Sequence, residues 1–182
     1  KFCKLNRNIS LDFLENSILS SQTNTYIPLG IQCAPTEFLK YCKLREKAFP
    51  FDWMFSNIKF IVNVLHDESF VGNSKAIFSS YEHFQTSENG THLANTEWSV
   101  LYPHHLPKDM EADGCYNRRL KRLKQILLDS TCKIFIHITE ISTATKFTLN
   151  SYCPNDNDSS EMINLCNTFD EAGINYKIIV ID

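Results

Sequence analysis

The sequence has no apolar run that approaches the roughly 20 residues needed to span a bilayer, and residues 1–17 contain no apolar signal core. No two of its seven cysteines have Cys-x-x-Cys spacing, and no cysteine–histidine cluster has the spacing of a zinc finger. We therefore expect reduced thiols, a cytoplasmic location, no metal and no other cofactor. Three Asn-x-Ser/Thr triplets leave a secreted or luminal location open.

Positive charge is also scarce, because 18 lysines and arginines stand against 21 aspartates and glutamates, for a net charge of −3 at pH 7. We therefore expect no nucleic-acid partner. The five glycines form no phosphate-binding loop beyond the single Gly30, which argues against a sugar-nucleotide-binding half of a transferase. The sequence also has no internal repeat and no low-complexity tract.

The composition that remains is that of a globular protein with an aromatic core. Hydrophobic residues make up 43% of the chain, and 13 residues are phenylalanine. A chain of 182 residues can bury a large core, so we expect residues 1–182 to form a single α/β domain. The sequence starts without methionine and stops on an apolar run, KIIVID. These ends predict a piece of a longer chain, in which a catalytic histidine could lie beyond residue 182.

Short apolar runs alternate with helical patterns along the chain. Residues 26–30, 133–138 and 176–181 are continuous apolar runs typical of buried strands, and amphipathic patterns lie between them. This order predicts an α/β fold with a parallel sheet flanked by helices, a three-layer arrangement of the flavodoxin-like or Rossmann-like kind. The three runs are expected to be neighbouring parallel strands.

Cys33 is the first candidate for chemistry. It follows the strand 26–30 and Gly30, which permits a sharp turn, and it precedes a helix that Pro35 opens. Ligands collect where strands of a parallel sheet end and helices begin. Free backbone N–H groups and the helix dipole at such a point predict a lowered thiol pKa and donors for an oxyanion. The alternative is a small buried residue at a junction.

A nucleophilic thiol needs a base, and a base needs an orienting group. His104 and His105 are adjacent in a loop stiffened by Pro103 and Pro107, so at most one of them is expected to face the thiol. An exposed polar loop is the alternative. Asp52 lies among the aromatic residues of FPFDWMF, where it either orients the imidazole or accepts backbone N–H bonds in a turn.

Two further features lie in the second half of the chain. The stretch RRLKRLK, residues 118–124, is either a solvated helix face or a place where Arg118 or Arg119 grips an anionic or carboxylate group. His137 lies inside an apolar run and is assigned to the core or to the end of a strand.

Residues 26–140 resemble an uncharacterised family of papain-like cysteine peptidases. The resemblance rests on four motifs: Leu29, Gly30 and Cys33; Phe51, Asp52 and Trp53; His104 and His105; Arg118 and Arg119. It implies a thiol-dependent hydrolase of peptides, with Cys33 as nucleophile, a histidine base and an acidic partner. It also implies a papain-like α+β fold as the alternative architecture. Gly30, Trp53, Arg118 and Arg119 are expected to border the substrate.

The strand order also resembles that of SGNH-type hydrolases, whose nucleophile follows the first strand of a flavodoxin-like sheet. That resemblance implies an acyl-ester hydrolase or an acyltransferase on glycans, with its histidine late in the chain. A non-catalytic binding domain of a larger protein is the third alternative, in which Cys33 and Asp52 hold a corner of the fold.

Overall fold

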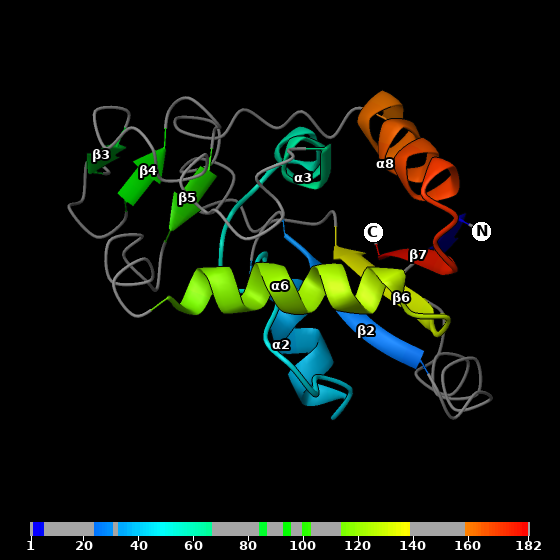
Figure 1. The fold of residues 1–182 in the computed structure, drawn as a ribbon. Coiled ribbons are helices and arrows are strands. Elements are labelled where there is room, and N and C mark those ends of the chain that lie inside the picture. The colour runs from blue at the N-terminus through cyan, green and yellow to red at the C-terminus, as the bar shows by residue number, and fades with distance from the viewer. Residues whose placement is uncertain are drawn as a thin grey trace.

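The computed structural model describes residues 2–5, 24–30, 33–66, 84–86, 93–95, 100–102, 114–138 and 159–181 (Figure 1). The strands are β1 (Phe2–Leu5), β2 (Asn24–Leu29), β3 (Phe84–Thr86), β4 (Leu93–Asn95), β5 (Val100–Tyr102), β6 (Cys132–Ile138) and β7 (Tyr176–Ile181). The helices are α2 (Ala34–Tyr41), α3 (Ile58–His66), α6 (Cys115–Leu128) and α8 (Ser159–Glu171). No helix within the described ranges is both long and apolar enough to cross a membrane.

The main sheet has four strands in the order β1-β7-β6-β2, and every neighbouring pair is parallel. The register places Leu29 of β2 opposite His137 of β6, and His137 opposite Val180 of β7. The prediction of three neighbouring parallel strands is therefore confirmed. Because the strands are parallel, the carboxyl ends of β2, β6 and β7 lie along one edge of the sheet.

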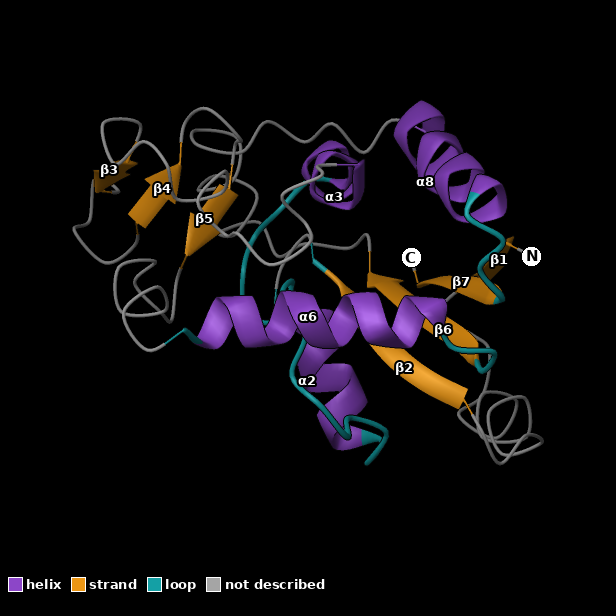
Figure 2. Cartoon of the chain, in the orientation of Figure 1, coloured by secondary structure: helices purple, strands orange, loops and turns teal. Residues whose placement is uncertain are grey.

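Helices cover both faces of this sheet (Figure 2). On one face Leu39 of α2 packs with Ile134 and Ile136 of β6. On the other face Phe135 belongs to a large core to which α3, α6 and α8 contribute. The two sets alternate along β6, as expected for a strand buried on both sides. The three-layer α/β arrangement predicted from the sequence is confirmed.

The remaining described strands form a small separate sheet. It is antiparallel and has the order β3-β4-β5. Helix α2, which begins just after Cys33, packs on the parallel sheet. In the described part of the chain, the helix that follows the candidate nucleophile thus has the setting of a doubly wound α/β protein.

The helices near the candidate site begin and pack for local reasons. Pro35 lies in the first turn of α2, where its missing N–H has no helical partner to lose. The Asn57 side chain accepts a hydrogen bond from the Phe60 amide at 2.6 Å and so caps the start of α3. In α6, Leu120 and Leu123 belong to the buried stripe expected from their spacing.

Candidate functional site

The carboxyl end of β2 contacts a segment that we call the aromatic turn, residues 49–56. A Cβ atom on Gly30 would lie 2.7 Å from Ser56 Oγ, so the Ser56 side chain would have to move, and 3.2 Å from the Phe51 carbonyl oxygen, which is a tight contact. The described glycines with positive φ are Gly114 and Gly173, so Gly30 does not need left-handed backbone geometry. The structure shows a reason for glycine at this position that the sequence did not indicate, which is the close approach of the aromatic turn to the end of β2.

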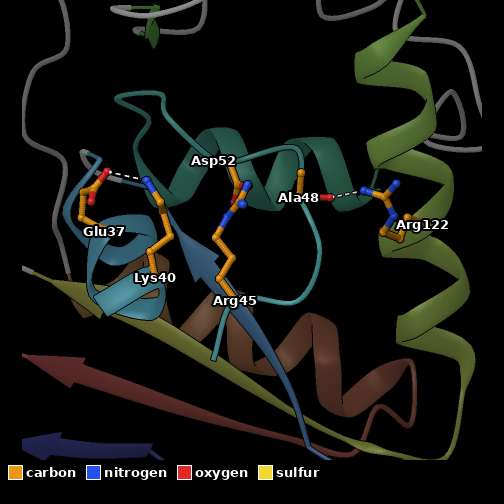
Figure 3. Close-up of polar contacts among 6 residues, drawn as sticks. All are labelled: Glu37, Lys40, Arg45, Ala48, Asp52 and Arg122. Carbon is orange, nitrogen blue, oxygen red and sulfur yellow. Dashed lines mark hydrogen bonds and ion pairs between the residues drawn. The ribbon is translucent and has the colours of Figure 1, made fainter. Parts of the chain in front are cut away.

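Two other contacts hold the aromatic turn in place. The Arg122 guanidinium of α6 donates to the carbonyl oxygen of Ala48, as Figure 3 shows. The Phe51 ring meets the Phe60 ring edge-on, with centroids 6.4 Å apart. The aromatic turn and Ala48, which precedes it, are therefore connected to α6, to α3 and to the end of β2.

Cys33 is the N-cap residue of α2, and its thiol is free and half-buried. Its carbonyl oxygen accepts the first helical hydrogen bond, from the Glu37 amide at 3.0 Å. Burial raises the pKa of the thiol to about 11, and the negative charge of Glu37 in the first turn adds to this. The prediction of a lowered pKa is therefore wrong. The helix dipole would lower the pKa of the thiol, but the loss of water around the thiolate raises it by more. The negative charge of Glu37 also raises it and so acts against the dipole. At neutral pH the described surroundings keep Cys33 protonated, so attack requires a base.

In the His104→Ala/His105→Ala protein, which lacks the two predicted bases, the rate at which iodoacetamide alkylates Cys33 should therefore rise about tenfold per pH unit between pH 7 and pH 10 and level off near the thiol pKa of about 11. Replacing Glu37 with Gln removes a nearby negative charge and should move this profile to lower pH. Glu46→Gln, at an exposed position beyond the helix, should leave it unchanged. The measurement is peptide mass spectrometry after timed labelling, and a rate already constant between pH 7 and pH 9 would contradict the raised pKa.

Asp52 is the buried polar group at the centre of the aromatic turn, with a side chain that is 0% exposed. Its Oδ2 accepts a hydrogen bond from Arg45 Nη2 at 2.6 Å, and Figure 3 shows the Arg45 side chain extending to it. Burial raises the pKa of the Asp52 carboxyl, while Arg45, the backbone of Phe49 and the charge of Arg119 oppose this. Asp52 therefore forms a buried ion pair with Arg45, which fixes the position of the Arg45 side chain.

Arg45 is the residue that sequence reasoning missed. It lies seven positions before Asp52, outside any of the motifs singled out above. The signal was available in principle, because a carboxylate among aromatic residues needs a cationic partner, and Arg45 is the arginine nearest to it in the sequence. The sequence around neither residue indicates its partner, so the ion pair becomes evident only in the folded loop that joins them.

The predicted substrate-binding residues divide into two groups. Arg119 is half-buried on α6 and acts electrostatically on Asp52, whereas Arg118 is exposed. Trp53 is half-buried next to Asp52 and has a φ of 63°, an uncommon value for a residue with a side chain. The Lys40 ammonium lies 4.8 Å from the centre of its ring, a cation–π contact. Arg119, Trp53 and Gly30 thus belong to one neighbourhood with Asp52.

Of the histidines considered in the sequence analysis, the structure describes His137. His104 and His105, the predicted bases, lie outside the described residues. His137 is described, and it lies opposite Leu29 near the carboxyl ends of both strands. Burial lowers its pKa to about 4, against a hydrogen bond with the backbone of Leu29 that favours the charged form. Its buried Nδ1 has no hydrogen-bond partner within the described ranges. At neutral pH His137 is therefore an uncharged imidazole beneath the edge where the site lies.

Metal chemistry has no candidate cluster in the part of the chain that the structure describes, because no three His, Cys, Asp or Glu side chains there could hold an ion. Cys33, Cys42, Cys115, Cys132 and Cys166 form no disulfide bond within the described part of the chain. The described residues thus place the Asp52 carboxylate beside Arg45, within the electrostatic influence of Arg119, whereas the Cys33 thiol lies at the start of α2, three residues beyond Gly30, which contacts the aromatic turn.

The fold and these residues define an α/β protein with a candidate thiol site at the carboxyl edge of a parallel sheet. Residues 24–181 match the model of a family described as "Putative papain-like cysteine peptidase", and the chain belongs to that family. No curated protein and no solved structure matches the chain.

Proposed function

We propose that this chain is a thiol-dependent hydrolase that cleaves peptides through a thioester at Cys33. The observation that carries the proposal is the position of Cys33, a free thiol at the N-cap of α2, directly beyond the carboxyl end of β2. Membership of a family described as cysteine peptidases supports the same chemistry.

The reaction balances in two steps. The sulfur of Cys33 bonds to the carbonyl carbon while a base takes the thiol proton, and that proton passes to the amine that leaves. Water then attacks the thioester and releases the acid and the thiol. Backbone N–H groups in the first turn of α2 are the donors proposed for the oxyanion. No oxidant, reductant or metal is needed for either step.

The proposed base is His105, with His104 as the alternative. The raised pKa of Cys33 makes a base necessary, because almost no thiolate forms at neutral pH without one. Asp52 is proposed to orient that imidazole. Its Oδ2 is engaged by Arg45, but its buried Oδ1 accepts no hydrogen bond within the described part of the chain and is available for an imidazole N–H.

A peptidyl vinyl sulfone tests this proposal, because its adduct requires both the thiol and a base. The expected result is one adduct at Cys33 at pH 7, which Cys33→Ala abolishes. Cys42→Ala removes a half-buried thiol at the other end of the same helix and should change nothing. His105→Ala should slow adduct formation at least about a hundredfold without lowering the melting temperature.

Two results would contradict the proposal. Labelling of Cys42 as fast as that of Cys33 would mean that the probe reports exposure and not an active thiol. Full adduct formation in the His104→Ala/His105→Ala double variant would remove both proposed bases. In either case a binding domain without catalysis becomes the better interpretation of the site.

Ester chemistry is the second candidate function, and the parallel sheet favours it. SGNH-type hydrolases place a nucleophile after the first strand of such a sheet, and Cys33 likewise follows a strand of a parallel sheet, although here that strand is β2, which β1 precedes in the chain. Comparing the hydrolysis of p-nitrophenyl acetate with release of amines from a peptide mixture separates the two. Cys33→Ala must abolish whichever activity is real. A thiol nucleophile works only when reduced, which supports a cytoplasmic location.

A further inference from the structure

Helix α2 carries Cys33, Glu37 and Lys40 on one face. Cys33 has helical backbone angles, with φ −72° and ψ −13°, and its carbonyl oxygen accepts a hydrogen bond from the Glu37 amide at 3.0 Å. Positions i, i+4 and i+7 of a helix lie above one another. At about 1.5 Å per residue, Glu37 lies about 6 Å and Lys40 about 10 Å from Cys33 along the helix axis. Glu37 and Lys40 are exposed on this face, whereas Leu39 is buried against the sheet.

Two groups of the chain hold the Lys40 ammonium. It lies 3.4 Å from Glu37 Oε1, a contact that Figure 3 shows, and 4.8 Å from the centre of the Trp53 ring. Trp53 belongs to the aromatic turn and is half-buried. A carboxylate and an indole face that flank one position form a site for a cation, because the carboxylate pairs with the charge and the ring attracts it. In the structure, a lysine of the same chain takes this position.

The backbone of Trp53 is strained. Its φ of 63° lies in the left-handed region, which glycine enters readily and a residue with a large side chain does not. Residues held in such a conformation cluster at active sites and ligand clamps, where the side chain is needed in one place. Glycine would remove the strain but also the ring. The strain and the cation contact therefore point independently to the same side chain.

Lys40 is a weak occupant of the site. Its ion pair with Glu37 is 3.4 Å long, and the two side chains are 48% and 56% exposed, so the pair contributes little to stability. An ammonium is a strongly hydrated point charge. A guanidinium is less hydrated, stacks flat on an indole and offers two parallel N–H groups to a carboxylate. An arginine side chain suits the pair Glu37 and Trp53 better than Lys40 does.

We infer that Glu37 and Trp53 bind an arginine side chain of the peptide substrate, which displaces the Lys40 ammonium, an inference that rests on the proposed function. An extended peptide advances about 3.3 Å per residue. A site about 10 Å along α2 from the thiol therefore corresponds to an arginine about three residues from the bond to be cleaved. Lys40 occupies the site until such a peptide binds.

Equilibrium dialysis of the Cys33→Ala protein tests this inference. The probe is a pool of N-acetylated heptapeptide amides made of alanine and serine, with Arg, Lys, Gln or Glu at one central position, and mass spectrometry reads the retained peptides. The Arg peptides should be retained at least about fivefold more than the Gln peptides, with the Lys peptides between them. Retention of the Glu peptides above the others would mean that Lys40 is the binding group, and would overturn the inference.

The Lys40→Gln variant gives the sharpest result. Removing the competing cation should raise retention of the Arg peptides about threefold, although the protein loses no negative charge. Lys47→Gln removes an exposed lysine elsewhere and should leave retention as it is. Glu37→Gln should abolish the preference for arginine, and Glu46→Gln, at an exposed position beyond the helix, should preserve it.

The ring is tested by two variants of Trp53. Trp53→Gly should abolish the preference, and its backbone accepts the φ of 63° without strain. Trp53→Phe should weaken the preference, because phenylalanine attracts a cation less than tryptophan does. If thermal unfolding shows that the Gly variant has not folded, the Phe variant carries the comparison.

The inference fails if Arg and Gln peptides are retained equally, including no retention of either, or if Lys40→Gln lowers retention of the Arg peptides. Binding by the Cys33→Ala protein does not depend on hydrolysis. A protein that prefers arginine but whose wild type is neither labelled at Cys33 nor active would refute the proposed function and leave the arginine site standing. A wild type that is labelled and active, without the preference, would refute the arginine site alone.

Discussion

Replacing Arg45 with Met should lower the free energy of unfolding by about 3 kcal/mol at pH 7. The Asp52 side chain is fully buried and loses the partner that lies 2.6 Å away, so a carboxylate remains in the core with only the more distant charge of Arg119. The Arg45→Met/Asp52→Leu double variant should be more stable than Arg45→Met alone, because apolar side chains can replace a buried ion pair at little cost. Urea unfolding of the four proteins completes the cycle.

A surface ion pair provides the matched control. Lys40 and Glu37 lie 3.4 Å apart on α2 with side chains 48% and 56% exposed, so Glu37→Gln should change the free energy of unfolding by less than about 1 kcal/mol. The Arg45→Met deficit should also shrink as the pH falls, because the buried Asp52 carboxyl then takes up a proton in the folded state. A double variant that loses as much as the sum of the two single variants would show that the pair is not coupled.

The wild-type protein should lose roughly 3 kcal/mol of stability as the pH falls from 6.5 to 4, owing to His137. The folded pKa of this histidine is about 4 because the ring is buried, whereas the unfolded value is near 6.5. Between these values the unfolded chain binds a proton that the folded protein does not, so acid favours unfolding. Above pH 6.5 the ring is neutral in both states, and the contribution of His137 to stability is then complete.

The variant that tests this is His137→Asn, which cannot titrate in this range and should flatten that part of the stability profile. His66→Gln is the control, because His66 is exposed at the end of α3, where Nε2 lies 2.9 Å from Thr168 Oγ1. Urea unfolding at pH 7, 6, 5 and 4 measures the slope. If the slope of the Asn variant equals that of the wild type, His137 is not the group responsible.

The sequence by itself determined three of the four strands of the main sheet and the position of Cys33 after one of them, whereas β1 and the antiparallel sheet were not predicted. Continuous apolar runs separated by amphipathic helices are sufficient to predict parallel strands, because only strands buried on both faces lack alternation. Gly30, Cys33 and Pro35 in succession predicted a strand that leads into a helix, and α2 does begin there. These features depend on neighbours within a few positions along the chain, so they can be predicted without the tertiary structure.

Only the tertiary structure decided the electrostatics of the site. The local pattern around Cys33 predicted a lowered pKa, but burial of the thiol in the folded protein, together with the charge of Glu37, raises it to about 11. The approach of Arg119 from α6 and the burial of His137 likewise depend on segments far apart in sequence. The pairing of Arg45 with Asp52, seven positions apart, depends on how the loop between them folds. The cost of a charge depends on how much water and which partners surround it, and these are set by how the segments pack together.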